Sequence, residues 1–243
     1  IMAALYLRLP KDLSDQAEIQ KMIDYGISQV EIMERHGVDS ILWEYGYGGI
    51  KSPAISDLEL EVMAKIILGI KAKTHSLKLG VEILWHYPFE TLKLAALTGA
   101  DFVRIDFFSD PMTADGEIVP MESQAIINYK NMVGASKVKL FTDIQVKYAE
   151  MINPNTTMTE SAERAIKSGS QGVIVSGRKS GQPPAISDVK DAKTGANNFD
   201  VIIGSGFSVQ NGLDLLEVAD GIIVGTSISV KTGGPLLEAK VQE

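Results

Sequence analysis

Cysteine, long apolar runs and an excess of basic residues are all absent from this sequence. The lack of cysteine excludes disulfide bonds and thiolate chemistry and is consistent with a reducing compartment. No apolar run reaches the roughly 18–20 residues that a membrane-spanning helix requires. The first residues lack the basic start and long apolar segment of a signal peptide. These absences predict a cytoplasmic protein that does not span a membrane.

Acidic residues outnumber basic ones, 31 to 23, which gives a net charge of −8. An acidic chain without a long basic run is poorly suited to the phosphate backbone, so we expect no nucleic acid partner. Its 243 residues, 45% apolar and 22% charged, are typical of a globular protein with a substantial core. We see no linker or low-complexity tract and expect a single domain over residues 1–243. The sequence leaves open whether the chain forms a homo-oligomer.

Short β-rich runs alternate with longer helical segments along the whole chain. Several of the runs are apolar almost throughout, as in parallel strands buried on both faces. Strand-helix units recur at intervals of about 30 residues, as βαβ units require. Eight such units predict a (β/α)8 TIM barrel, a parallel eight-stranded barrel with outer helices, and an open doubly wound sheet is the alternative. The expected strands are residues 3–7, 40–44, 79–84, 102–107, 137–143, 172–176, 201–204 and 221–224.

Local motifs predict helix starts and two insertions. The Ser-x-x-Glu at 56–59 and the Thr-x-x-Glu at 157–160 are typical of capping boxes. An insertion at 108–120 contains Ala-Asp-Gly at 114–116, which predicts the tip of a hairpin. The segment at 177–186 is rich in Gly, Ser and Pro, and we expect a mobile loop there. The loop candidates are Ser176, Gly177, Ser180 and Gly181.

Polar residues occur at the ends of several expected strands. In a TIM barrel the loops after the strands build the active face. A single carboxylate there is as often a solvated or capping group, but several together would raise at least one pKa unless a cation intervenes. That cation could be Arg104, Lys147 or Mg²⁺, although the spacing matches no specific metal motif. The candidate catalytic residues are Glu44, Glu82, Arg104, Asp106, Asp143, Lys147 and His86.

Histidines and lysines differ in their expected places. His36 and His75 lie near predicted helix C-termini and are interpreted as structural. His86 follows the third strand, where it is either an acid/base or a surface loop residue. Lys147 is the better placed amine nucleophile, and Lys139, within a strand, is the alternative for Schiff-base chemistry.

Two glycine turns follow the seventh and eighth strands. The first is Gly204, Ser205 and Gly206, with Ser208 expected to cap the following helix, and the second is Gly225, Thr226 and Ser227. Free N–H groups and the positive end of a helix suit a phosphate, and barrels frequently place a phosphate site at these two loops. Tight turns without a ligand are the alternative.

Five motifs follow one another along the chain. They are Gly-Ala-Asp-Phe-Val-Arg at 99–104, Thr-Asp-Ile-Gln-Val-Lys at 142–147, Val-Ser-Gly at 175–177 with Ser-Gly-Gln-Pro-Pro at 180–184, Ile-Gly-Ser-Gly at 203–206, and Asp-Gly-Ile-Ile-Val-Gly-Thr-Ser at 220–227. In this order they resemble the BtpA family, named for a photosystem I biogenesis protein of cyanobacteria. The resemblance implies a (β/α)8 barrel with a phosphate-type site and settles no activity.

The chain departs from the family pattern at the reactive strand ends. Trp85-His-Tyr stands where the family usually has Arg-Asn-Asp, and Asp106 stands where it usually has Asn. Tyr148 replaces a usual histidine after Lys147, and Ser229 replaces a lysine. The phosphate side is kept while the reactive half is altered and more acidic.

Two functions fit these observations. The first is an enzyme acting on a small phosphorylated metabolite, a sugar phosphate or a nucleotide-like compound. Arg104 would then position an anionic or carbonyl oxygen, Asp143 with Asp106 or Glu82 would act as acid/base, and Lys147 would stabilise developing negative charge. The second is a non-catalytic assembly or stability factor that keeps the barrel.

Overall fold

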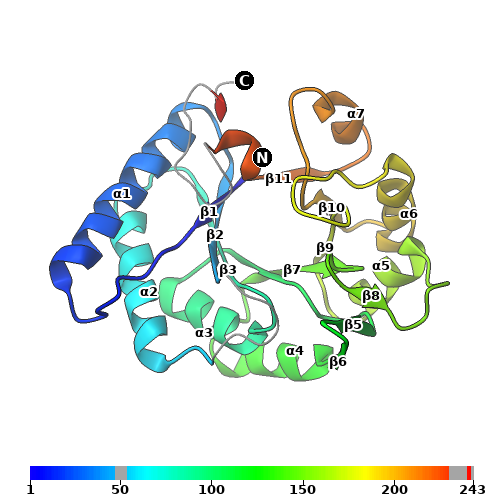
Figure 1. Ribbon diagram of the computed structural model, residues 1–243, viewed down its shortest axis with the longest axis horizontal. Coiled ribbons are helices and arrows are strands. Elements are labelled where there is room, and N and C mark those ends of the chain that lie inside the picture. Colours follow the sequence, from blue (N-terminus) through cyan, green and yellow to red (C-terminus); the bar gives the residue numbers. More distant parts are fainter. Residues whose placement is uncertain (47–53, 230–239, 242–243) are drawn as a thin grey trace.

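Eight parallel strands close into a barrel in the order β1-β11-β10-β9-β7-β4-β3-β2. The computed structural model describes residues 1–46, 54–229 and 240–241 (Figure 1). The closed sheet confirms the predicted (β/α)8 barrel and is not the open doubly wound alternative. The strands are β1 Met2–Tyr6, β2 Ser40–Tyr45, β3 Lys78–Ile83, β4 Phe102–Ile105, β7 Lys139–Ile144, β9 Gly172–Val175, β10 Asp200–Ile203 and β11 Gly221–Val224.

Helices surround the barrel on its outside (Figure 1). The predicted capping boxes are present, because Ser56 with Glu59 starts α2 and Thr157 with Glu160 starts α5. Within the described residues, no helix is long and apolar enough to cross a membrane. The helices are α1 Gln16–Arg35, α2 Asp57–Lys71, α3 Pro88–Thr98, α4 Ser123–Met132, α5 Met158–Lys167, α6 Ile186–Ala196 and α7 Gly212–Leu216, with a 3-10 turn η1 at Thr226–Ile228.

A small second sheet lies beside the barrel, in the strand order β6-β5-β8. β5 (Met112–Ala114) and β6 (Glu117–Val119) form the predicted hairpin, and β8 (Glu150–Met151) pairs with β5. Asp115 and Gly116 have φ angles of 51° and 79°. Two successive positive φ values are typical of a type I′ hairpin turn.

The barrel interior changes character along its axis. At the amino-terminal end of the strands, Phe102 and Phe141 meet edge to face with ring centroids 5.8 Å apart. A Cβ on Gly80 would lie only 2.0 Å from the Phe102 ring, so the glycine leaves room for that ring inside the barrel. Side chains alternate along a strand, so the inward positions two residues further on are Arg104 and Asp143. The apolar layer is Met2, Ala4, Leu42, Phe102, Phe141, Ile174, Ile202 and Ile223.

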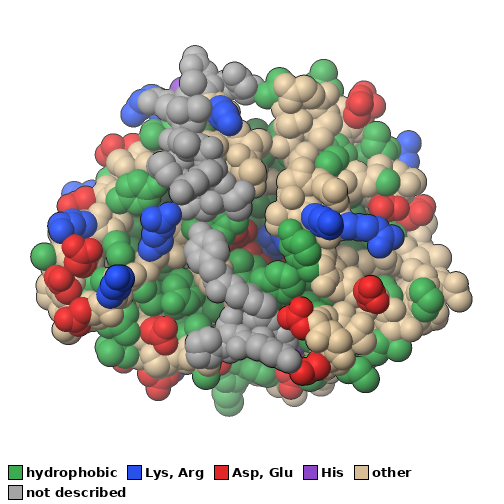
Figure 2. Space-filling view, in the orientation of Figure 1, with side chains coloured by type: hydrophobic (Ala, Val, Ile, Leu, Met, Phe, Trp, Pro, Cys, Tyr) green, Lys and Arg blue, Asp and Glu red, His purple; other side chains and the backbone are tan. Residues whose placement is uncertain are grey.

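We use "mouth" for the carboxyl end of the barrel strands. In the same orientation as Figure 1, Figure 2 shows a central hollow with acidic and basic side chains at its base. Because the interior is apolar at one end and ionic at the other, the fold places its charged groups directly beneath the mouth.

Candidate active site

Arg104 and Asp143 form a two-pronged ion pair inside the barrel. Arg104 Nε donates to Asp143 Oδ2 at 2.7 Å, and Nη2 donates to Oδ1 at 2.8 Å. The two residues lie on neighbouring strands, β4 and β7, and are 2% and 1% exposed. Both oxygens of Asp143 are therefore occupied, and the guanidinium plane is fixed.

Two further carboxylates face the same guanidinium. Glu44 Oε1 lies 3.5 Å from Arg104 Nη1, and Glu82 Oε1 lies 3.5 Å from Nε. Burial raises the pKa of Glu82 well above its usual value, against the opposing charge of Arg104. Burial alone would lower the pKa of Arg104, but the charges of Asp143 and Glu82 raise it well above its usual value. Arg104 therefore stays charged, while burial favours the neutral form of Glu82.

Asp106 lies two residues after Arg104 and carries a strongly shifted carboxyl group. Burial first, and the charge of Asp143 second, raise the pKa of Asp106 to about 7, although Arg104 and Lys147 oppose the shift. Within the described residues its Oδ1 has no hydrogen-bond partner. The carboxyl group therefore exchanges a proton near neutral pH, as a general acid or base should. We call Glu44, Glu82, Arg104, Asp106 and Asp143 the ion cluster.

The ion cluster holds its carboxylates around an arginine. In the ranges 1–46, 54–229 and 240–241, no group of three or more His, Asp or Glu side chains is arranged to hold a metal ion. Of the cations expected from the sequence, the structure thus brings Arg104 among the carboxylates, and Lys147 close enough to lower the pKa of Asp106. The described residues give no geometry for Mg²⁺.

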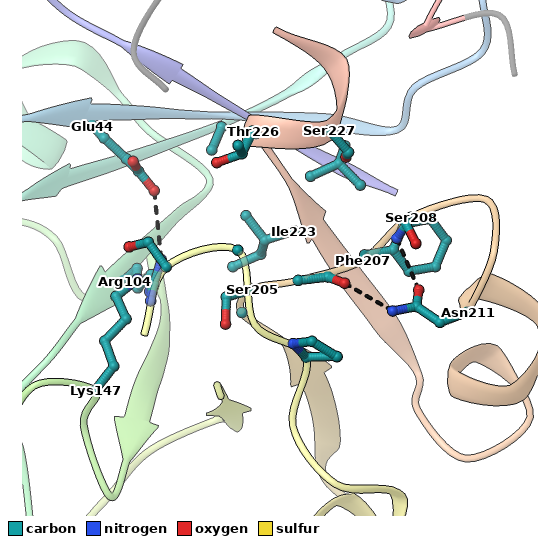
Figure 3. Close-up of a pocket in the computed structure, with 18 of the residues that line it drawn as sticks. Glu44, Arg104, Lys147, Ser205, Phe207, Ser208, Asn211, Ile223, Thr226 and Ser227 are labelled. Atoms are coloured by element: carbon teal, nitrogen blue, oxygen red, sulfur yellow. Dashed lines mark hydrogen bonds and ion pairs between the residues drawn. The ribbon is translucent and has the colours of Figure 1, made fainter. Parts of the chain in front are cut away.

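A first cavity of about 330 Å³ opens beside the ion cluster at the mouth. Figure 3 shows Glu44, Arg104 and Lys147 on one side of it and Thr226 and Ser227 on another. The two glycine turns predicted as a phosphate site therefore line the same cavity as the predicted reactive residues. The lining residues predicted from sequence are Glu44, Arg104, Lys147, Ser180, Gly181, Gly204, Ser205, Gly206, Gly225, Thr226 and Ser227.

Backbone N–H groups in the two turns are without acceptors. The N–H groups of Gly206, Gly225, Thr226 and Ser227 donate to no acceptor in the part of the chain that the structure describes. All four residues line the first cavity. Unsatisfied N–H groups from two turns are the usual basis of an anion site at this place in a barrel.

Gly206 also has a packing role that the sequence does not reveal. Its φ is +73°, and a Cβ there would lie 2.0 Å from the backbone nitrogen of Pro183. Next to it, Ser205 Oγ donates to the Gln182 carbonyl at 2.8 Å and accepts the Gly177 N–H at 3.1 Å. The turn after β10 is therefore fastened to the loop after β9, and glycine is required for that close approach.

The expected helix cap at Ser208 is wrong. The helix α7 begins at Gly212, and the segment before it is a turn closed by Asn211. The Ser208 N–H donates to Asn211 Oδ1, and Asn211 Nδ2 donates to the Gly206 carbonyl, both at 2.9 Å (Figure 3). The glycines and serines of the motif favour a helix start. The Asn211 side chain instead bonds the Ser208 N–H and the Gly206 carbonyl, so the segment forms a turn and the helix begins only at Gly212.

A second cavity of about 280 Å³ adjoins the first. Asp106 lines the second cavity, together with the aromatic residues Trp85 and Tyr148. Lys147 lines both cavities, and its amine forms no hydrogen bond or ion pair with any residue that the structure describes. The residues shared by the two cavities are Tyr6, Glu44, Arg104, Lys147 and Ser180.

Some predicted residues lie away from both cavities. His86 packs edge-on against Phe107, with ring centroids 6.0 Å apart, and burial lowers the pKa of His86. Lys139 starts β7 and so lies at the opposite end of the barrel from the mouth. Ser176 is near Gly204, where a Cβ would lie 2.4 Å from Ser176 Oγ. Asp143 and Glu82 are buried behind Arg104 and line neither cavity.

Sequence reasoning missed several lining residues. Tyr6 ends β1, so the strand-end rule that found Glu44 would have found it. Trp85 and Tyr148 follow strand ends but were noted only as departures from the family pattern. Asn211 lies beyond the glycine turn, and no signal in the sequence distinguishes its role from that of a surface polar residue.

The sequence is similar to those of other known proteins. An uncharacterized protein of Methanocaldococcus jannaschii, MJ1115, is 29% identical over 222 residues, which cover 90% of this chain and 82% of that protein. The photosystem I biogenesis protein BtpA of Synechocystis is 29% identical over 163 residues, which cover 66% of this chain and 55% of that protein.

A solved structure shares the fold. The phosphoribosyl anthranilate isomerase from Thermus thermophilus superimposes with a TM-score of 0.60 at 12% identity, covering 100% of this chain and 95% of that one. At this level of identity the likeness concerns the barrel alone. Residues 1–241 match the BtpA family, and the chain therefore belongs to that family.

Proposed function

We propose that the chain is an enzyme acting on a small phosphorylated metabolite, a sugar phosphate or a nucleotide-like compound. The observation that carries the proposal is one cavity with two kinds of wall. The turns after β10 and β11 offer unsatisfied backbone N–H groups, and Glu44, Arg104 and Lys147 face them. Such a cavity suits a phosphate at one side and a reacting group at the other.

The phosphate would bind to Gly206, Gly225, Thr226 and Ser227. Their N–H groups lack acceptors in the described ranges, and the loops after the seventh and eighth strands are a frequent phosphate site in barrels. The name of the structurally similar isomerase indicates a phosphoribosyl substrate, which is consistent with this assignment.

The acid/base group would be Asp106. It lines the second cavity, and its pKa of about 7 lets it give or take a proton near neutral pH. Asp143 would act as a positioning residue, because both of its oxygens hold Arg104. Arg104 Nη1, with only a long 3.5 Å bond to Glu44 in the described part, could then donate to a substrate oxygen. Lys147 would stabilise developing negative charge.

The alternative, a non-catalytic assembly or stability factor, does not explain why the ion cluster is present. Burying carboxylates around one arginine has a desolvation penalty that apolar side chains of similar volume would avoid. An assembly factor would need an exposed surface rather than a titrating group in a cavity. The ion cluster therefore favours an enzyme.

Isothermal titration with inorganic phosphate and ribose 5-phosphate tests the phosphate site. Thr226 is exposed in the turn after β11, so Thr226→Asp should fold normally and repel a phosphate. We expect both ligands to bind the unmodified chain and to bind this variant at least about tenfold more weakly.

The matched control is Thr194→Asp, which adds the same charge to an exposed position of α6 outside both cavities. It should leave binding unchanged. Absence of binding to the unmodified chain, or equal weakening by the two variants, would refute the proposed phosphate site.

A further inference from the structure

The second cavity has an aromatic wall. Trp85 follows β3 and Tyr148 follows β7, and their rings lie 5.6 Å apart at 33° to one another. Tyr6, at the end of β1, lines the same cavity, as do the aliphatic residues Leu84 and Val146. Flat apolar faces of this kind suit a planar ligand, because aromatic rings stack on planar groups.

The small sheet holds the indole of this wall in place. Trp85 packs on the cluster formed by Phe107, Met112, Ala114, Val119 and Val146, most of which belong to the hairpin insertion or flank it. The insertion at 108–120 therefore supports the indole of Trp85 by packing against it.

Tyr148 joins two loops at the mouth. Its hydroxyl accepts the Ser180 N–H at 2.9 Å, and its own N–H donates to the Arg178 carbonyl at 3.4 Å. The phenol ring is thereby fixed between the loop after β7 and the loop after β9. A fixed ring loses little conformational freedom when a ligand binds.

One polar group meets this aromatic wall from inside the barrel. Asp106 is 5% exposed, lines the second cavity, and has an Oδ1 without a partner in the described ranges. A buried carboxyl group with an unpartnered oxygen is destabilising, so a ligand atom that forms a hydrogen bond with the Asp106 carboxyl group is favoured. In its protonated form Asp106 donates a hydrogen bond, which a ring nitrogen or carbonyl oxygen would accept.

We propose, resting on the phosphate site described above, that the second cavity holds a planar nitrogen-containing ring attached to the phosphorylated part of the substrate. The ring lies against Trp85 and Tyr148, and Asp106 bonds to its edge. The two cavities share lining residues, Arg104 and Lys147 among them, and so lie side by side. A substrate with its phosphate in the first cavity and its ring in the second would place the linking sugar near Arg104 and Lys147. The substrate class is a ribosyl phosphate that carries an aromatic base or aryl amine.

Three probes separate the two halves of such a substrate. Ribose 5-phosphate carries sugar and phosphate without the ring, adenosine carries sugar and ring without the phosphate, and adenosine 5′-monophosphate carries all three. Binding of each is measured by isothermal titration to the unmodified chain and to the variants Trp85→Leu and Tyr148→Leu. Tyr25→Leu is the matched control, because Tyr25 is 48% exposed on the outside of the barrel and Tyr148 is 50% exposed.

We expect adenosine 5′-monophosphate to bind at least about tenfold more tightly than ribose 5-phosphate, given the strength of stacking on aromatic side chains. Trp85→Leu and Tyr148→Leu should remove that advantage while leaving ribose 5-phosphate binding unchanged. Tyr25→Leu should keep it.

Equal binding of the two phosphates, or an advantage that survives both substitutions, would overturn the ring proposal and leave the phosphate site intact. Adenosine binding that depends on Trp85, without any ribose 5-phosphate binding, would support the ring site and overturn the phosphate site. Failure of all three probes to bind would overturn both.

Discussion

The two sides of the mouth are built by opposite means. On one side, the strands β2, β3, β4 and β7 and the residue after β4 contribute the ion cluster, whose ionisable side chains are buried inside the barrel. On the other side, the turns after β10 and β11 contribute backbone N–H groups and hydroxyls, with no ionisable side chain among residues 204–208 and 225–229. The ion cluster changes its charge with pH, whereas the turns do not.

This difference separates two demands on an enzyme of phosphorylated compounds. A fixed array of backbone dipoles binds a phosphate without needing a protonation state of its own. Proton transfer needs a group whose pKa lies near the working pH, and burial among like charges provides one at Asp106. The comparison predicts that substitutions in the ion cluster will change the unfolding free energy, and its dependence on pH, more than substitutions in the turns.

Removing the positive charge of the ion cluster should have the largest effect. Arg104→Met leaves buried carboxylates without a cation, so we expect the free energy of unfolding to fall by about 3–5 kcal/mol. Urea unfolding followed by circular dichroism measures the loss. Arg104→Lys keeps the charge without the two-pronged geometry and should lose less.

Lys167→Met is the control for Arg104→Met. It removes a lysine paired with Glu163 on the surface of α5, and such pairs contribute about 0–1 kcal/mol. If Arg104→Met were no more destabilising than Lys167→Met, the buried pairing of Arg104 with the carboxylates would contribute no more to stability than a surface ion pair.

The second prediction concerns Asp106 and pH. In the unfolded chain its pKa is near 3.8, and burial raises the pKa to about 7 in the folded protein. As pH rises through that interval, the unfolded chain gives up the proton while the folded chain keeps it, so Asp106 lowers the stability of the fold progressively and fully above about pH 7.

Asp106→Asn removes this titration. Relative to the unmodified protein, the variant should gain a few kcal/mol of unfolding free energy between about pH 5 and about pH 8, measured by urea titration at each pH. Asp214→Asn, at an exposed position of α7, is the control and should show no such trend. A difference between variant and parent that stays constant with pH would show that Asp106 is ionised throughout.

The barrel was predictable because its determinants are local. Apolar runs such as residues 172–176 and 221–224 predict buried parallel strands, and the Asp-Gly turn at 115–116 predicts the hairpin. Strand-end position also identified Arg104 and Asp106, and the alternation of side chains along β4 placed them on one side.

The partnerships within the site were not predictable in the same way. Arg104 and Asp143 are 39 residues apart, and only the register of β4 against β7 brings them together. His86 follows a strand end like the others, yet its ring turns to Phe107 rather than to a cavity. The glycine at 206 suggests close approach by a phosphate, but the structure also brings Pro183 against it.

The smallest predicted effect tests the loop contact on the turn side. Ser205→Ala removes the hydroxyl that joins Gln182 and Gly177, and should lower the unfolding free energy by about 1–2 kcal/mol. Ser208→Ala makes the same chemical change in the same turn, where the hydroxyl has no hydrogen-bond partner in the described ranges, and should have almost no effect. Amide hydrogen exchange at residues 177–182 should quicken in Ser205→Ala alone, because the N–H of Gly177 loses its acceptor. Equal exchange in the two variants would mean that the loop after β9 is held by its packing on Gly206, and that the hydroxyl contributes little to the turn side of the mouth.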